Sequence, residues 1–445
     1  MRPEAGQPFN QPPGDALDAQ ERTEPALQYL AQAQTQASAL PGALRMEPRL
    51  VETVAIIGAG TMGAGIAICA IDAGLKVILL EQNNAAMERG RERVSGHYQG
   101  RVVKGKLSSE AAAAGLALLS HSTDWTLLGH ADLVIEAVFE ELAVKQDVFR
   151  QIDAHARVDA VLATNTSYLD VDAIANATQR PQDVVGLHFF SPANVMKLLE
   201  VVSGSKTSPQ VLATGMAFGK MLRKTPVLCG NAFGFIGNRI YNAYRKQCEF
   251  MLEDGAWPED VDQALEAFGF AMGPFAVADL SGLDIAWRMR RASAATRDPR
   301  ERYVGVLDAL CEMGRLGRKS GSGYYSYFDG KKSQATDATA RQCIEAASRQ
   351  RGIVRTTLEP AAMQRRALLA MLNEAALLLA ESVAQRASDI DVVLVQGYGF
   401  PRSQGGPVFW ARQQDRQALE HDLRHLAASS GYGFTVADLT QLLTA

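Results

Sequence analysis

The feature that most constrains the fold is a glycine motif at the end of a short apolar run. The stretch VAIIGAGTMG, residues 54–63, places G-x-G-x-x-G directly after a β-branched segment and at the start of a helical one. Gly58 permits a tight turn, Gly60 lets the backbone approach a bound phosphate, and Gly63 allows close helix–strand packing. The free N–H groups and the dipole of the following helix favour an anion there. The motif therefore predicts a dinucleotide-type phosphate site at the first strand-to-helix turn.

Strand-like runs alternate with helical stretches from Val51 to about Val202. The expected strands are VAIIGAG, KVILLE, DLVIEAV, AVLATN, VVGLHFF and LLEVV. Such alternation predicts a mainly parallel sheet with helices on both faces. Glu81 ends the second strand, where an acidic residue accepts hydrogen bonds from both ribose hydroxyls and repels a 2′-phosphate. The expected cofactor is therefore NAD and not NADP.

Polar residues follow or interrupt the later strands. Ser167 in ATNTS comes after the fourth of them, where side chains face the ligand crevice of an open α/β sheet. A helix N-cap is the alternative for Ser167. His188 and Glu200 lie in the otherwise apolar stretch LHFFSPANVMKLLEVV, and core strands rarely bury charge unless it is paired. From these residues alone, a structural histidine beside a surface glutamate remains an alternative to a catalytic pair.

The remaining chain has a different character. Residues 1–48, rich in Pro, Gln and Ala, are expected to be a leader or linker with a short helix around Glu24–Ala39. After Phe233 the chain becomes helical, with a weak internal repeat in which D-x-D precedes an aromatic-glycine pair and then G-P. We expect an NAD-binding domain at 49–230, helical domains at 231–328 and 361–445, and a linker at 329–360.

Composition excludes several classes of protein. The net charge of the 445 residues is -4, which gives no basic footprint for nucleic acid or for a membrane surface. No apolar run is long enough to cross a bilayer. Five scattered cysteines favour a reducing compartment and no zinc site, so we expect no metal. The N-terminus lacks a secretion signal, which makes the cytoplasm the expected location.

Six ordered blocks carry a family resemblance: GAGTMGAGIA, DLVIEAVFEELAVKQDVF, ATNTSYLDV, GLHFFSPANVMKLLEVV, GFIGNR and GRKSGSGYYSY. Together they resemble the NAD-dependent L-3-hydroxyacyl-CoA dehydrogenases of fatty-acid β-oxidation, from about Val51 to Trp410. The second repeat, ending GYGFPRSQGGPVFW, is similar to the dehydrogenase half of multifunctional β-oxidation proteins. The resemblance implies an α/β Rossmann-type domain followed by two all-α C-terminal-type domains.

The resemblance also implies residue roles. His188 would be the catalytic acid/base and Glu200 its orienting partner, a pairing that fixes the imidazole tautomer. The other catalytic positions implied are Ser167 and Asn238. The cofactor positions are Gly58, Gly60, Met62, Gly63, Glu81, Val138, Glu140, Lys145, Ser167 and Lys319. The substrate positions are Ser167, Ser191, Asn238, Lys104 and Tyr398.

Two of these positions carry alternatives. Single-function members of the family have Asn where this chain has Ser191, so an amide hydrogen bond from that position is in doubt. Lys104 belongs to a basic run on the helical stretch after Glu81, which could meet the phosphates of coenzyme A or be only a solvated face.

The expected reaction is oxidation of (S)-3-hydroxyacyl-CoA to 3-oxoacyl-CoA. One alternative is a dedicated 3-hydroxybutyryl- or 3-hydroxyadipyl-CoA dehydrogenase, and another is a catalytically silent NAD-binding protein. Only about fifty residues precede the first strand, so we expect no hydratase activity and a separate hydratase and thiolase as partners. A second repeat on the same chain predicts a monomer, or a dimer through another surface.

Overall fold

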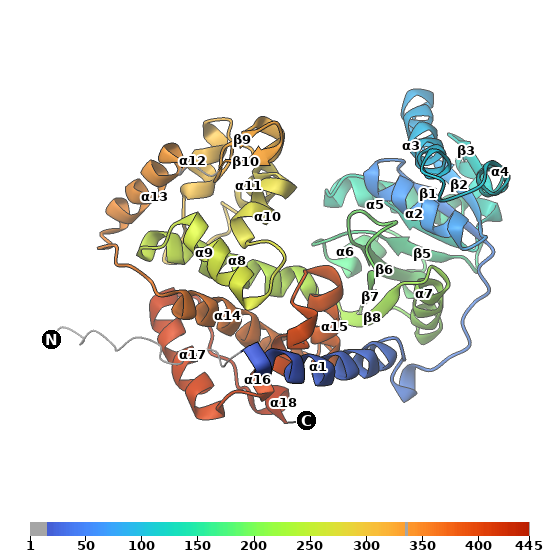
Figure 1. The fold of residues 1–445 in the computed structure, drawn as a ribbon. Helices are drawn as coiled ribbons and strands as arrows, with labels where there is room; N and C mark the ends of the chain where they lie inside the picture. Colours follow the sequence, from blue (N-terminus) through green and yellow to red (C-terminus); the bar gives the residue numbers. More distant parts are fainter. Residues whose placement is uncertain (1–15, 334–336, 445) are drawn as a thin grey trace. The chain divides into compact units, whose positions relative to one another are not determined.

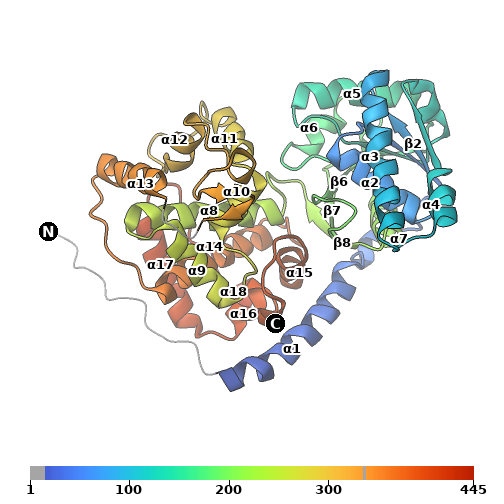
Figure 2. The same ribbon diagram turned by 45° about the horizontal axis from the view of Figure 1, so that its top comes forward.

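A computed structural model describes residues 16–333 and 337–444, which form two compact units (Figures 1 and 2). The sheet unit consists of residues 29–239 and 378–398. The helical unit consists of 240–377 and 399–444, together with the first part of the N-terminal helix.

The sheet unit is built on eight strands in the order β3-β2-β1-β4-β5-β6-β7-β8. Neighbouring strands are parallel except for the antiparallel pair β6–β7. The strands are β1 (Thr53–Ile57), β2 (Lys76–Leu80), β3 (Leu119–Ser122), β4 (Leu133–Glu136), β5 (Val161–Thr164), β6 (Val184–Phe189), β7 (Leu198–Ser203) and β8 (Thr225–Gly230). The predicted mainly parallel sheet is confirmed.

Helices cover both faces, which explains why the central strands are apolar throughout instead of alternating. The helices around the sheet are α2 (Thr61–Asp72), α3 (Asn84–Val103), α4 (Ser109–Leu116), α5 (Leu142–His155), α6 (Val171–Ala175) and α7 (Pro209–Met221). Strands β3 and β8 were not predicted. The edge strand β3 reads LSHS and lacks an apolar run, and β8 contains Pro226. Edge strands tolerate both features.

A segment from late in the chain completes the sheet unit. Gly230 N–H at the end of β8 donates to Val383 O at 2.8 Å, and the helix α15 (Ala387–Gly397) then contacts β7. A side chain at Gly397 would meet Leu198 Cδ2 at 2.6 Å, so the helix can approach the strand only because Gly397 has none. The second repeat is therefore divided, and α15 belongs to the sheet unit.

The N-terminal helix α1 (Ala16–Ala37) lies over this segment (Figure 1). Tyr29 Oη donates to Asp391 Oδ2 of α15 at 2.7 Å, and Arg386 Nη2 donates to Ala39 O at 3.3 Å. Leu30 and Ala37 are completely buried. Within the residues expected to be a leader, the chain thus forms a helix of 22 residues whose later part is packed.

The helical unit contains most of the first repeat and those parts of the second repeat that lie outside residues 378–398. Its elements are the body of α8 (Gly237–Asp254), α9 (Pro258–Phe268), α10 (Pro274–Ser281), α11 (Leu283–Ala292), α12 (Val306–Glu312), the hairpin β9–β10 (Tyr327–Phe328, Lys331–Lys332), α13 (Ala338–Arg351), most of α14 (Pro360–Ala380), α16 (Pro407–Arg412), α17 (Arg416–Ser430) and α18 (Thr440–Leu443). Helix α13 lies within the expected linker and buries Ile344.

A buried aspartate has the same place in each D-x-D motif. In α9, the Asp262 carboxylate accepts the N–H groups of Phe275 and Ala276, the first turn of α10, and the hydroxyl of Tyr325. Burial raises the pKa of Asp262 to about 6, although these bonds favour its ionised form. Its counterpart in α15 is Asp391, which accepts the hydroxyl of Tyr29. The N-terminal helix thus supplies to the second repeat the tyrosine contact that the segment just before β9 supplies to the first.

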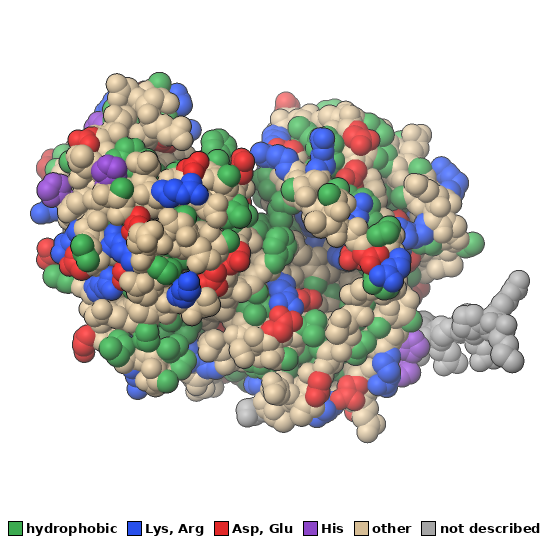
Figure 3. Space-filling model, turned by 180° about the vertical axis from the view of Figure 1, so that it is seen from behind, with side chains coloured by type: hydrophobic (Ala, Val, Ile, Leu, Met, Phe, Trp, Pro, Cys, Tyr) green, Lys and Arg blue, Asp and Glu red, His purple; other side chains and the backbone are tan. Residues whose placement is uncertain are grey.

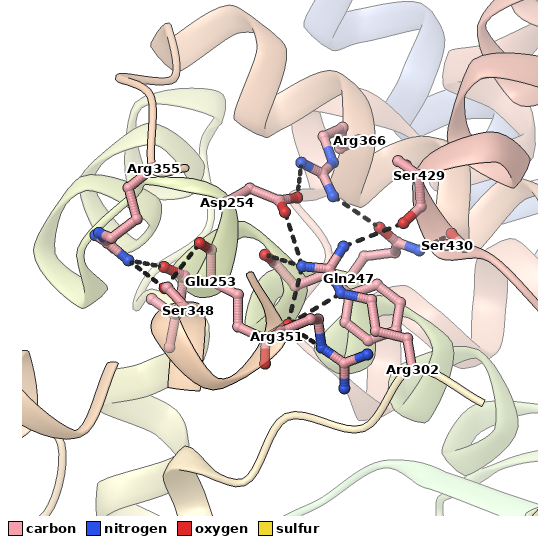
Figure 4. Close-up of polar contacts among 12 residues, drawn as sticks. Gln247, Glu253, Asp254, Arg302, Ser348, Arg351, Arg355, Arg366, Ser429 and Ser430 are labelled. Carbon is pink, nitrogen blue, oxygen red and sulfur yellow. Dashed lines mark hydrogen bonds and ion pairs between the residues drawn. The ribbon is translucent and has the colours of Figure 1, made fainter. Parts of the chain in front are cut away.

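A network of buried ions joins segments of the helical unit (Figure 4). Glu253 of α8, 2% exposed, pairs with Arg302 at 3.0 Å and with Arg351 of α13 at 3.2 Å. The neighbouring Asp254 pairs with Arg302 at 2.7 Å and with Arg366 of α14 at 2.8 Å. Burial raises the pKa of Glu253, and the adjacent arginines oppose that effect. The network holds the first repeat, the α13 segment and the second repeat together.

The surface carries charges of both signs. Acidic and basic side chains are interspersed over the face of the molecule shown in Figure 3. Among the described residues, no helix is both long and apolar enough to cross a membrane.

Candidate active site

The glycine motif forms the predicted turn between β1 and α2. Gly58 has φ +96°, and a Cβ at Gly63 would lie 1.8 Å from Gly58 O, so neither position accepts a side chain without rearrangement. A Cβ at Gly60 would meet nothing within 4 Å. The backbone is therefore open at Gly60, immediately before the N-terminus of α2, where an anion is stabilised.

Glu81 lies against this turn. Its Oε1 accepts Ala59 N–H at 2.6 Å, and Arg93 of α3 donates to Ala59 O at 3.0 Å. Met62, in the first turn of α2, is half-buried against the apolar core. An open glycine turn with a carboxylate at the end of β2 is the arrangement that binds the pyrophosphate and adenosine ribose of NAD. These residues therefore fit that cofactor.

A buried ion pair lies at the carboxyl end of β4. Lys145 Nζ contacts Glu136 Oε1 at 2.6 Å, and both side chains are almost completely inaccessible to solvent. Val138 N–H also donates to Glu136 Oε1, at 2.8 Å. Lys145 lies 3.4 Å from Glu140 Oε2, and Glu140 Oε1 accepts Ser167 N–H at 2.7 Å. A continuous chain of contacts thus connects the buried Glu136 to the turn that presents Ser167.

His188 and Glu200 face each other across the antiparallel pair β6–β7. They are directly opposed in the strand register, so their side chains project from the same face of the sheet. Nδ1 of His188 lies 2.7 Å from Glu200 Oε2, and both residues are buried, with His188 4% and Glu200 0% exposed. Phe190 and Phe235 rings lie beside the imidazole, at 4.4 and 5.6 Å between centroids. The pair is therefore desolvated, and its contact with Glu200 engages Nδ1 and not Nε2.

Glu200 is held at the start of α8. Its Oε1 accepts the N–H groups of Ile236 at 3.2 Å and Gly237 at 3.0 Å, where the helix dipole favours a negative charge. On the adjacent strand β8, burial and the charge of Glu200 raise the pKa of Cys229 well above its usual value. Its thiol stays protonated and is a poor nucleophile.

Asn238 lies next to this pair in the first turn of α8. Its Nδ2 donates to Ser167 O at 3.3 Å, and its Oδ1 accepts the hydroxyl of Tyr398 at 2.8 Å. Asn238, Ser167 and Tyr398 therefore meet within the sheet unit although they are far apart in the sequence.

The remaining predicted residues are Ser191, Lys104 and Lys319. Ser191 is exposed after β6, and Lys104 is exposed at the C-terminal end of α3. In the basic run before Lys104, Arg101 pairs with Asp72 at 3.1 Å. Lys319 belongs to the helical unit, where its Nζ contacts Asp284 Oδ1 at 2.5 Å. The proposed roles of these residues remain predictions.

Some polar residues were not predicted. Glu136 is the acidic residue inside the apolar run LVIEAV, and that isolated charge was the available signal. Asn165 Oδ1 accepts Phe189 N–H at 2.9 Å and so braces β6 beside His188. His421 and His425 of α17 have i,i+4 spacing, with Nε2 atoms 2.9 Å apart. Within the described residues, no group of three or more potential ligands that could hold a metal was found.

Comparison with known proteins agrees with this geometry. Residues 53–232 match the 3-hydroxyacyl-CoA dehydrogenase NAD-binding domain, and residues 234–327 match the C-terminal domain of the same family. The chain is 30% identical to 3-hydroxybutyryl-CoA dehydrogenase from Escherichia coli, covering 85% of this chain and 94% of that one, with a TM-score of 0.73. The chain belongs to the 3-hydroxyacyl-CoA dehydrogenase family.

Two further proteins resemble this chain, one over almost its whole length and the other over about half of its own length. The dehydrogenase part of multifunctional enzyme 1 from C. elegans is 27% identical, with 94% of this chain and 98% of that chain covered and a TM-score of 0.64. The peroxisomal bifunctional enzyme of Danio rerio is 41% identical over 403 residues, which is 87% of this chain and 55% of the relative. The chain thus spans about half the length of this curated relative.

Proposed function

We propose that this chain catalyses the NAD-dependent oxidation of (S)-3-hydroxyacyl-CoA to 3-oxoacyl-CoA in fatty-acid β-oxidation. The observation that carries the proposal is the buried contact of 2.7 Å between His188 Nδ1 and Glu200 Oε2, beside Asn238 and the Ser167 turn. Membership of the 3-hydroxyacyl-CoA dehydrogenase family supports it.

His188 acts in this proposal as the acid/base. Because Nδ1 donates to the Glu200 carboxylate, Nε2 carries the lone pair and accepts the proton of the 3-hydroxyl group. Glu200 stabilises the imidazolium that forms, and its two backbone hydrogen bonds hold the carboxylate in place. The aromatic rings around His188 exclude water, which strengthens these electrostatic interactions. Ser167 and Asn238 orient the substrate oxygen.

NAD supplies the hydride acceptor. The Gly58–Gly63 turn and Glu81 are assigned to its pyrophosphate and ribose, and Val138, Glu140 and Lys145 to the cofactor side of the same crevice. Lys145 is buried between two carboxylates, so its contribution is to hold Glu140 and, through it, the Ser167 turn.

The test is NADH consumption with acetoacetyl-CoA by the wild type and His188→Ala, followed by a longer 3-oxoacyl-CoA. The expected loss of kcat in His188→Ala is about 10²–10⁴-fold, with NADH binding retained. His155→Ala, at the end of α5 and bonded to Gln151 O, is the matched control and should keep wild-type kcat. A folded wild type that binds NADH but turns over neither thioester would favour the silent NAD-binding alternative.

A narrower substrate range is the second candidate. The similarity to the E. coli 3-hydroxybutyryl-CoA dehydrogenase favours it, because that relative is covered almost completely. The ratio of kcat/KM for four-carbon and longer substrates separates a short-chain enzyme from a general β-oxidation dehydrogenase. The same comparison of kcat/KM includes 3-hydroxyadipyl-CoA as a third substrate.

We also propose that this chain works with a separate enoyl-CoA hydratase, which supplies its substrate, and with a thiolase, which consumes its product. NADH formation from an enoyl-CoA and NAD⁺ should then require added hydratase. A monomer, or a dimer through another surface, is proposed because parts of both repeats already pack in one helical unit. A tetramer built through the repeats, detected by light scattering, would contradict this assembly.

The domain limits 49–230, 231–328 and 361–445 are part of the proposal, and limited proteolysis tests them. The family matches at 53–232 and 234–327 support the first two. A cytoplasmic location is proposed from five free and buried cysteines. Because the Danio rerio relative is named peroxisomal, cell fractionation with a peroxisomal marker is the deciding measurement.

A further inference from the structure

The second helical repeat contributes one side chain to the polar cluster of the sheet unit. Tyr398 caps the C-terminal end of α15, and its hydroxyl donates to Asn238 Oδ1 at 2.8 Å across 160 residues of sequence. Tyr398 and Asn238 both belong to the sheet unit. The contact therefore lies within one compact body.

Two features hold the Tyr398 ring in place. A Cβ on Gly237 would lie 2.2 Å from Tyr398 Cε2, so the ring occupies the space that a side chain at Gly237 would need. The ring also packs edge-on against Phe190, with centroids 5.6 Å apart, and Phe190 lies beside His188. These contacts do not involve the hydroxyl, so Tyr398→Phe removes the hydrogen bond to Asn238 and leaves the packing of the ring in place.

Two hydrogen bonds together set which way the amide of Asn238 faces. Ser167 O accepts from Nδ2 at 3.3 Å, and a carbonyl oxygen cannot pair with Oδ1. Tyr398 donates to Oδ1 and stabilises the same orientation from the opposite side. With Oδ1 occupied and one N–H bonded to Ser167 O, the amide presents its second N–H as the group for a substrate oxygen.

We propose that Tyr398 is a positioning residue that fixes the Asn238 amide as a hydrogen-bond donor to the substrate's 3-oxygen or thioester oxygen. This inference rests on the proposed dehydrogenase function. It gives the second repeat a part in catalysis that acts through Asn238, in place of the direct substrate contact that the sequence predicts for Tyr398. Since the N–H bond strengthens as negative charge develops on the oxygen, the loss should appear in kcat.

The test compares Tyr398→Phe with the wild type in the acetoacetyl-CoA assay. The expected result is a fall in kcat of about 3- to 10-fold, the usual effect of one hydrogen bond, with an unchanged Kd for NADH. Tyr29→Phe is the matched control, because it too removes a phenol hydroxyl from the sheet unit. The hydroxyl of Tyr29 donates to Asp391 of α15 and not to Asn238. The kcat of this variant should remain that of the wild type.

A double-mutant cycle separates positioning from a general structural effect. In an Asn238→Ala background, Tyr398→Phe should cause no further loss of kcat, whereas a structural role would cause the same loss in both backgrounds. The same four proteins unfolded in urea should show coupling between the two residues, a measurement that does not depend on activity. Equal kcat of Tyr398→Phe and wild type, or additive losses, would overturn the role of Tyr398. A wild type inactive on every thioester would overturn the proposed function itself, even if unfolding still showed the coupling.

Discussion

The two units bury their charged side chains in different places. In the sheet unit, Glu136 at the end of β4 pairs with Lys145 of α5, and His188 of β6 pairs with Glu200 of β7. In the helical unit, Glu253 and Asp254 are surrounded by arginines that come from other segments of the same unit.

The difference shows that burial of charge alone does not mark an active site. Each carboxylate in the helical network is bonded to arginines, so the ions mainly compensate one another. His188 instead keeps one ring nitrogen that is not bonded to Glu200. A polar atom that the buried pair itself does not use, at the ligand-binding edge of a sheet, indicates an active site more specifically than burial of charge does.

The largest expected effect comes from the carboxylate of the catalytic pair. Glu200→Gln keeps the shape of the side chain but removes the charge that stabilises the imidazolium. We expect kcat to fall by about 10²–10⁴-fold while NADH still binds, measured by steady-state kinetics and by NADH fluorescence. A kcat near that of the wild type in this variant would show that the His188–Glu200 pair stabilises the fold, like the ion pairs of the helical unit, and does not act in catalysis.

Glu253→Gln is the matching substitution in the helical unit. Arg302 keeps its bond to Asp254, and burial already disfavours the ionised form of Glu253, so the cost should be moderate. We expect the free energy of unfolding in urea to fall by about 1–3 kcal/mol. The kcat should not change, and a large loss of kcat would break the distinction between the two units.

The helical unit should also become more stable in mild acid. Burial raises the pKa of both Asp262 and Asp279 to about 6, so the folded state binds more protons than the unfolded state between about pH 4 and 6. Stability from these groups is gained as pH falls and lost as pH rises through 6. From pH 7 to 5.5 the gain should be about 0.8 kcal/mol for each group.

Urea unfolding at both pH values measures this gain. Asp279→Asn cannot titrate, so its stability should change less than that of the wild type over the same interval. An identical change in the two proteins would show that Asp279 is ionised throughout the range.

The smallest expected effect concerns the N-terminal helix. Tyr29→Phe removes the hydrogen bond to Asp391 and leaves that buried carboxylate with one donor fewer. We expect the free energy of unfolding to fall by about 0.5–1.5 kcal/mol. Tyr325→Phe, the counterpart on Asp262 in the first repeat, should cost a similar amount, and a much smaller cost for Tyr29→Phe would break the equivalence of the repeats.

Much of the sheet unit could be predicted because its information is local. The β-branched runs gave six of the strands, and the glycine motif gave the cofactor turn with Glu81. Strands β3 and β8 were not predicted because LSHS and TPVLCG lack the uniform apolar character of the central strands. Both strands lie at the edges of the sheet, where such sequences are tolerated. The pairing of His188 with Glu200 was accessible because only a short loop separates their strands.

Contacts between distant segments could not be predicted. Nothing near Tyr398 in the sequence indicates that its hydroxyl meets Asn238, since the contact depends on how α15 packs on β7. The polar composition of residues 329–360 similarly hid the helix α13, which buries only a narrow stripe. Residues 1–48 were predicted to contain a helix, but the partner of that helix lies more than 340 residues away.

The division of the second repeat has a consequence for the order of folding. Residues 378–398 complete the sheet unit, and the bond between Tyr29 and Asp391 closes a loop of 362 residues. During synthesis the early part of a chain usually folds first, but here α1 and the edge strand β8 must wait for a segment near the end. Until the ribosome has released residues 378–398, Tyr29 of α1 and Gly230 of β8 lack these hydrogen-bond partners, so the sheet unit cannot be completed before that point of synthesis.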